Sequence, residues 1–385
     1  MLILKAEITQ KRLLFNKKIY IFIIIQTGLF GALFAQQSYV VYNTTNSFLL
    51  DNRVNCISVD SNNTKWIGTE WGLNSFDDVV WESFSSFVNH SPVRCIEFDS
   101  SGIMWVGTLD GLFRYDGFNW SHYNSQNTTL TNQINCLAFD ENNKLWVGTS
   151  SGLFSYDGRN FNLELDSSSV EPSFINVTKL LFNGDSLVIS TMNGGIAYLY
   201  AGSIVWYNTF FGGLPDNSSF DIEVLADSSI IYAAPQGGLL MHHYSGSWFN
   251  WNVINSPSFP SNSLTCFEKI DSNIYLAGTT GAGLFTFSFL FGSPSTTVFD
   301  TANNSVPENY ILDIKKDFLG VVWIGTESSG LVKWSGSTNI IENEFINNSV
   351  VKTFDLFGRE SLPVKGIPFL YKDEKGLVDK RVIIE

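Results

Sequence analysis

Six polar or aromatic residues share one place in the sequence, a short turn that follows the phrase Trp-x-Gly-Thr or its variants. They are Glu70, Trp71, Asp110, Asn193, Gln236 and Glu327. Carboxylates and amides can bind hydroxyl groups, and an exposed tryptophan can stack on a sugar ring. Two of the acids could catalyse hydrolysis only at a separation of about 5 to 10 Å. These residues are the candidate ligand-binding site; the alternative is a set of solvated turns in which Trp71 folds onto its own repeat.

The other reactive side chains form no catalytic motif. The histidines are His90, His122, His242 and His243. None has a partner at metal-ligand spacing, and adjacent His242 and His243 would point to opposite faces of a strand. The sequence contains no nucleophile elbow, phosphate loop or HExxH. Turns beginning at Asp60, Asp99 and Asp140 lack the alternating carboxylates of a calcium loop, so we expect tight turns. We predict no catalytic residue, no metal and no cofactor.

Four cysteines occur in one recurring context. They are Cys56, Cys95, Cys136 and Cys266, in "VNCIS", "VRCIE", "INCLA" and "LTCFE". Residues at one repeat position lie on equivalent strands of different repeats, whereas a disulfide needs Cα atoms within about 7 Å. We therefore predict buried, unpaired thiols.

The turns that carry the candidate site belong to a repeat. Its glycine recurs as Gly72, Gly111, Gly152, Gly195, Gly238, Gly283 and Gly330, at intervals of 39 to 47 residues. The second repeat contains four segments with the pattern of short strands, namely "VRCIEFD", "MWVGT", "LFRYD" and "FNWSHY". Asp116-Gly117, between the last two, is typical of a tight hairpin turn. Four antiparallel strands in a repeat of this length form a β-propeller blade. We predict an all-β, seven-bladed propeller; six or eight blades is the alternative.

The ring needs a closing strand. The seventh repeat ends at "KWSGS" (Lys333–Ser337) without a fourth strand, whereas "YVVYN" near the N-terminus parallels "SHYN", with Tyr42 matching Tyr123. We predict that this N-terminal strand completes the seventh blade and covers both edges. In such a blade the turns between second and third strands share one face with the loops between blades. Glu70, Asp110 and Glu327 would then form an acidic, partly aromatic rim.

The net charge bears on the class of ligand, and the N-terminal sequence bears on the location of the protein in the cell. The formal net charge is −14, which argues against nucleic acid, because phosphate binding needs clustered Lys and Arg. Basic residues precede the apolar run 19–35, which ends before "QQSYVVYN". This pattern predicts a signal peptide, residues 1–35, cleaved near Ala35; an uncleaved membrane anchor is the alternative.

The repeat "NxIxCIxxDxxxxxWIGTxxGLxxYDGxxW" resembles the two-component regulator propeller repeat, over about Gln37 to Gly336. In that family such blades form extracytoplasmic sensor domains of membrane histidine kinases, many in Bacteroidetes that respond to glycans. No kinase, phospho-acceptor or DNA-binding segment follows in this sequence. The resemblance thus implies the fold and a ligand-binding role, but it names no ligand.

The C-terminal segment, 339–385, resembles a short type IX secretion (type A) sorting tail. The matching pieces are "DLFGRE", "GIPFLYKDEKG" and "KRVIIE", and the motif residues are Asp355, Gly358, Arg359, Glu360, Gly366 and Lys380. The resemblance implies export by the type IX machinery to the outer-membrane surface or the medium, with membrane contact only during export or by anchoring. A C-terminal hairpin packed on the propeller (36–338) is the alternative.

We therefore expect a secreted or surface-displayed, non-catalytic protein that binds a glycan or a partner protein through the rim. The alternatives are an extracellular lyase or hydrolase that uses rim carboxylates, and an accessory ligand-binding subunit of a sensor or adhesion system.

Overall fold

The computed structural model describes residues 39–166, 175–210, 212–289, 295–334, 350–354, 369–373 and 378–381, and every regular element in these ranges is a β-strand. The predicted signal peptide, 1–35, lies outside the described residues. Within them, no helix is long and apolar enough to cross a membrane.

Seven four-stranded antiparallel sheets make up the propeller. Blades 1 to 3 are β2 (Val54–Val59), β3 (Lys65–Thr69), β4 (Gly72–Phe76), β5 (Trp81–Ser83); β6 (Val93–Phe98), β7 (Met104–Thr108), β8 (Gly111–Tyr115), β9 (Trp120–Tyr123); and β10 (Ile134–Phe139), β11 (Leu145–Thr149), β12 (Gly152–Tyr156), β13 (Phe161–Asp166). Blades 4 to 6 are β14 (Asn176–Asn183), β15 (Ser186–Met192), β16 (Ile196–Tyr200), β17 (Ser203–Tyr207); β18 (Asp221–Val224), β19 (Ile230–Ala234), β20 (Gly238–His242), β21 (Trp248–Trp251); and β22 (Leu264–Asp271), β23 (Ile274–Thr279), β24 (Leu284–Ser288), β25 (Ser295–Phe299). Blade 7 is β26 (Ile311–Lys316), β27 (Val322–Thr326), β28 (Leu331–Trp334) and β1 (Tyr39–Tyr42).

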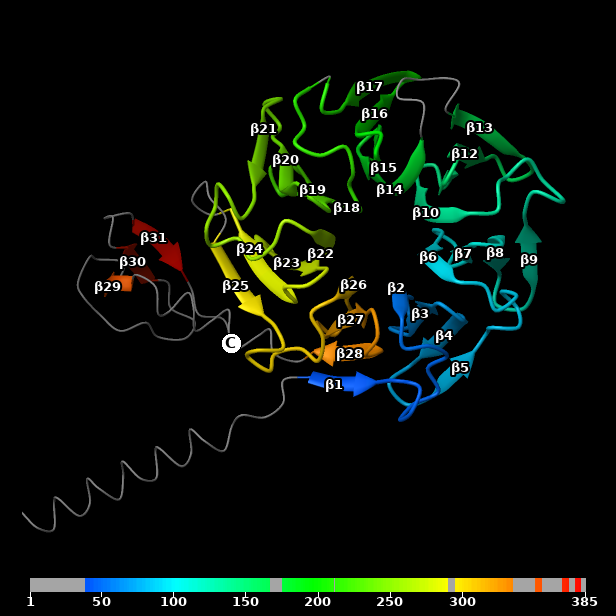
Figure 1. The fold of residues 1–385 in the computed structure, drawn as a ribbon, viewed down its shortest axis with the longest axis horizontal. Coiled ribbons are helices and arrows are strands. Elements are labelled where there is room, and N and C mark those ends of the chain that lie inside the picture. Colours follow the sequence, from blue (N-terminus) through cyan, green and yellow to red (C-terminus); the bar gives the residue numbers. More distant parts are fainter. Residues whose placement is uncertain are drawn as a thin grey trace, which may run out of the picture. The chain divides into compact units, whose positions relative to one another are not determined.

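The first strand of every blade lies innermost, and the blades surround a central axis (Figure 1). The prediction of a seven-bladed propeller with four-stranded blades is therefore confirmed. We call the side that carries the turns between second and third strands, together with the loops between blades, the rim face. The opposite side, with the first-to-second and third-to-fourth turns, is the base face.

Each interface between blades is an apolar core built from facing sheets. Cys56 and Val93, for example, belong to one buried cluster that joins blades 1 and 2. A Cβ on Gly68 would collide with Cys56 Sγ and with Val93, so the Gly of Trp-x-Gly-Thr makes room for the cysteine and the next blade. The same relation joins Gly107, Gly148 and Gly278 to Cys95, Cys136 and Cys266. All four cysteines carry free thiols.

The aspartates of the first-to-second turns hold the turns themselves. Asp60 Oδ1 accepts the N–H groups of Asn62 (2.9 Å) and Thr64 (3.0 Å), while Oδ2 accepts the indole N–H of Trp66 (3.0 Å). Asp140 and Asp317 bind their own turns and indoles in the same way. Their oxygens are thus occupied by the protein, which fits the expectation of tight turns.

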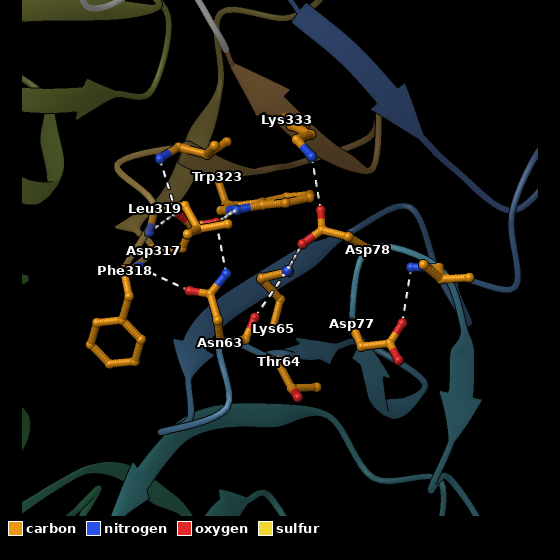
Figure 2. A network of polar contacts seen from close by, with 12 residues as sticks. Asn63, Thr64, Lys65, Asp77, Asp78, Asp317, Phe318, Leu319, Trp323 and Lys333 are labelled. Carbon is orange, nitrogen blue, oxygen red and sulfur yellow. Dashed lines mark hydrogen bonds and ion pairs between the residues drawn. The ribbon is translucent and has the colours of Figure 1, made fainter.

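The seam between blades 7 and 1 has features of its own. β1 pairs with β28 from Tyr39↔Trp334 to Tyr42↔Leu331, and Tyr42 stacks on Trp323 as Tyr123 stacks on Trp105. On the base face, Lys65 of blade 1 is 0% exposed and forms an ion pair with Asp78, which Lys333 of blade 7 also contacts at 2.8 Å (Figure 2). The seam therefore combines strand pairing with a polar network that we call the seam latch: Lys65, Asp78, Trp323 and Lys333.

The C-terminal region contains a three-stranded antiparallel sheet, β29 (Val350–Phe354), β30 (Phe369–Asp373) and β31 (Val378–Arg381). Of the predicted sorting residues, Lys380 lies in β31 and pairs with Leu370. Asp355, Gly358, Arg359, Glu360 and Gly366 lie outside the described residues.

Candidate functional site

Loops between blades connect the six candidate residues of the rim face in three pairs, each through residues of the loop. Each loop leaves one blade and enters the next, so its side chains reach the turns on both sides. The pairs are Glu70 with Glu327, Trp71 with Asp110, and Asn193 with Gln236.

Arg53 joins the first pair across the ring seam. Its guanidinium forms an ion pair with Glu327 of blade 7, and its Nε lies 3.6 Å from Glu70 Oε2 of blade 1. Asn55 adds a hydrogen bond to Glu70 Oε2 at 3.1 Å. These two carboxylates are therefore partners of a shared cation, a poor arrangement for general acid and base chemistry.

The loop 84–92 joins the second pair. The rings of Trp71 and His90 meet edge to face with centroids 6.5 Å apart, and Asn89 Nδ2 donates to Asp110 Oδ2 at 2.7 Å. Asn89 and His90 are consecutive residues in the left-handed region, with φ of 55° and 52°. Such backbone costs about 1 to 3 kcal/mol for each residue and concentrates at ligand sites. Trp71 is 59% exposed, so its ring is available to a ligand.

The loop 208–220 joins the third pair. The N–H of Asn193, in blade 4, donates to Ser218 Oγ at 3.0 Å, and the N–H of Gln236, in blade 5, donates to Asp216 Oδ2 at 2.9 Å. The backbones of both turns are thereby fixed by one loop.

Asparagine side chains bind the backbone of several rim loops, a feature that the sequence analysis missed. In the loop before blade 1, Asn46 Oδ1 accepts the Asn43 N–H (2.8 Å) and Asn52 Oδ1 accepts the Thr44 N–H (2.9 Å). The same pair of bonds recurs before blades 3 and 6, through Asn127 with Asn132 and Asn255 with Asn262. The repeated Asn-x-x-Asn spacing was the available signal.

The central channel is a second place where reactive side chains meet. Its cavity of about 530 Å³ is lined by the innermost strands. The position equivalent to Cys56 in each blade carries Cys56, Cys95, Cys136, Lys179, Asp221, Cys266 and Asp313. The position two residues later carries Ser58, Glu97, Ala138, Leu181, Glu223, Glu268 and Lys315. Some blades thus have a charged side chain at a position where other blades have cysteine or a small residue.

Most channel charges are bound to the wall. Asp221 contacts Lys179 Nζ at 2.9 Å and accepts the N–H of Phe267 in the next blade at 2.7 Å. Asp313 of blade 7 likewise accepts a backbone N–H of the next blade, that of Ile57 in blade 1, at 2.6 Å. These aspartates therefore connect neighbouring blades.

Burial in the channel raises the pKa of several acids there. Burial raises the pKa of Asp313 to about 7, and it also raises the pKa of Glu97, although that side chain is accessible from the lumen. Burial raises the pKa values of Glu223 and Glu268 in the same direction. The Asp221 carboxylate raises the pKa of Lys179, so that amine stays charged.

The channel lining contains no histidine or tyrosine among the residues that the structure describes, and no group of three potential metal ligands forms in the described ranges. His242 instead lies between blades 4 and 5, where its Nδ1 is 2.6 Å from Tyr198 OH and its ring stacks on Trp248.

A family model described as two component regulator propeller matches residues 88–110 and 130–151. These segments run from the loop before blades 2 and 3 to the rim turn of each blade, and the first includes Asn89, His90 and Asp110. Comparison with curated protein sequences finds no match.

Three solved structures illustrate the fold. The extracellular domain of the hybrid two component system BT3049 from B. thetaiotaomicron is 18% identical, with a TM-score of 0.70 over 88% of this chain and 48% of that one. PorZ, a surface component of the type-IX secretion system of Porphyromonas gingivalis, is 14% identical, with a TM-score of 0.58 over 87% of this chain and 60% of that one. Virginiamycin B lyase from Staphylococcus aureus is 12% identical, with a TM-score of 0.58 over 77% and 98%. This chain spans about half of the BT3049 domain, and the likeness is one of fold.

Proposed function

We propose that this protein is an extracellular, non-catalytic binding protein whose rim face engages a glycan. The observation that carries the proposal is Trp71, an exposed aromatic ring on a turn tip that contacts His90, whose neighbour Asn89 binds Asp110. An aromatic face with an amide and a carboxylate beside it suits the apolar face and the hydroxyl groups of a sugar ring.

Two further observations support binding without catalysis. Arg53 engages both Glu70 and Glu327, which removes them as a free acid and base. Side-chain amides hold the backbone of the rim loops before blades 1, 3 and 6, and a loop that is fixed before binding loses little entropy.

Export by type IX secretion, with the sorting tail 339–385 removed at the surface, is part of the same proposal. The likeness to extracellular sensor domains and to PorZ supports an extracellular location. Deletion of 350–385 should leave a folded propeller in the periplasm. Normal export of that variant would contradict a sorting role.

An extracellular lyase is the second candidate, and the channel favours it more than the rim does. Glu97 lines the lumen and burial raises its pKa, which is the direction that favours a general acid. Polysaccharide cleavage that is lost in Glu97→Gln would establish this alternative.

A glycan-array screen of the full-length chain, followed by thermal shift with each hit, tests the proposal. We expect at least one glycan to raise the melting temperature of the parent protein but not that of Trp71→Ala. If no glycan binds, the proposal fails, and capture of a surface protein would point to the accessory-subunit role.

A further inference from the structure

The turns and loops of the rim face are acidic, and the one Lys or Arg described in them is already engaged by two carboxylates. Carboxylates lie on this face at Asp51, Glu70, Asp110, Asp216, Asp300, Glu308 and Glu327. Arg53 is the sole lysine or arginine in the described turns and loops of this face, and it is engaged by Glu70 and Glu327. A polyanionic ligand would find no unpaired Lys or Arg on these turns and loops, and the carboxylates there would oppose it. The next cation is Arg94, which lies one residue inside β6 and lines the channel.

Asp110 is connected to the aromatic platform through the loop 84–92. Its Oδ2 accepts the Asn89 amide at 2.7 Å, Asn89 is adjacent in sequence to His90, and His90 contacts Trp71. No described cation forms an ion pair with Asp110; the Lys and Arg ion pairs of the structure involve other acids. This carboxylate is therefore available to a positive group on a ligand.

Trp71 favours the same kind of ligand. A cation over an indole ring gains energy from the negative face of the ring, and Trp is the strongest partner of this type. An amino sugar can place its pyranose face on Trp71 and its ammonium group near Asp110. A uronate or a sulfated sugar would place a negative charge at the same point.

We infer that the ligand of the rim face is a glycan that bears free amino groups, rather than an acidic polysaccharide. This inference rests on the proposed function, because it assigns a charge class to the glycan that Trp71 would bind.

The test is calorimetric titration of the full-length chain at about pH 6, where a sugar ammonium group is protonated. The probes are glucosamine oligomers, N-acetylglucosamine oligomers of the same length, and oligogalacturonate. Opposite charges about 5 Å apart in water attract enough to change affinity about fourfold. We expect the glucosamine oligomer to bind at least about fourfold more tightly than its acetylated form, and added salt to reduce that advantage.

Asp110→Asn should remove most of the advantage while leaving the acetylated oligomer unaffected. Asp116→Asn is the matched control, because Asp116 lies on the base face and caps its own turn through the Phe118 and Asn119 N–H groups. It should behave as the parent protein does.

The outcomes separate the two claims. If oligogalacturonate binds as tightly as the glucosamine oligomer, or if Asp110→Asn keeps the preference, the inference is wrong while glycan binding stands. If none of the three probes and no array glycan binds, or if Trp71→Ala binds as the parent does, the proposed function itself is wrong.

Discussion

The seam latch makes a quantitative prediction about how the ring is held together. Asp78 occupies the place that Gly117 and Gly158 hold in blades 2 and 3, and it adopts a left-handed φ of 76° that favours glycine. Lys65 occupies the place of Met104 and Leu145. Blade 1 thus combines a strained aspartate with a buried lysine, and the two form an ion pair (Figure 2). The aspartate gives the buried ammonium group its counter-charge, and this ion pair offsets the backbone strain.

The change Asp78→Gly relieves the strain but leaves the Lys65 ammonium without its carboxylate. Removing one partner of a buried ion pair costs about 3 to 5 kcal/mol. The Asn63 carbonyl at 3.0 Å and the Trp323 ring at 5.0 Å remain, and relief of the strain returns about 1 kcal/mol. We therefore expect a net loss of about 2 to 4 kcal/mol in the free energy of unfolding.

The double variant Lys65→Met/Asp78→Gly restores the combination that blade 2 uses, so it should recover most of the loss. The assay is urea unfolding followed by tryptophan fluorescence, with Gly158→Asp as a control. That control adds a strained aspartate with open space around it and no lysine to meet, so we expect a loss of about 1 kcal/mol. The reasoning is refuted if Asp78→Gly is as stable as the parent, or if the double variant is no better than the single one.

Three further predictions concern the rest of the ring. Deleting Gln36–Thr45 removes β1 and the stacking of Tyr42 on Trp323, so the melting temperature of the whole propeller should fall; an unchanged value would show that the strand does not close the ring. Gly68→Ala drives a methyl group into Cys56 Sγ and Val93, and overpacking of this kind should cost about 1 to 3 kcal/mol in urea unfolding, whereas a neutral result would mean that the interface can yield. Asp313 has a folded-state pKa of about 7, above its value of 3.8 as a free side chain, so the folded state binds a proton first and the protein should gain stability as the pH falls from 7 towards 4. Asp313→Asn should flatten that part of the stability profile, and an unaltered slope would contradict the assignment.

Much of the fold could be predicted because the repeat carries it locally. Gly111, Asp116-Gly117 and the alternating "VRCIEF" define turns and strands within one blade, and seven copies define the ring. The rim turns could also be placed on one face, because antiparallel strands leave no other position for them.

The pairing of rim residues could not be predicted in the same way. Glu70 and Glu327 become neighbours through Arg53 only when the ring closes, and nothing in either turn indicates it. Trp71 and Asp110 are linked through the strained pair Asn89 and His90, which the sequence does not mark as left-handed. The channel did leave a signal: Lys179, Asp221 and Asp313 stand where other repeats have cysteine.

The measurement that tests the central claim most directly is the dissociation constant of the best array glycan for the full-length chain, Trp71→Ala and Phe118→Ala. Phe118 is 92% exposed on the base face, so it controls for the loss of an exposed aromatic ring. The account predicts that Trp71→Ala weakens binding at least about tenfold, about 1.4 kcal/mol, while Phe118→Ala leaves it unchanged. Equal affinity for all three proteins, or a loss confined to Phe118→Ala, would contradict it.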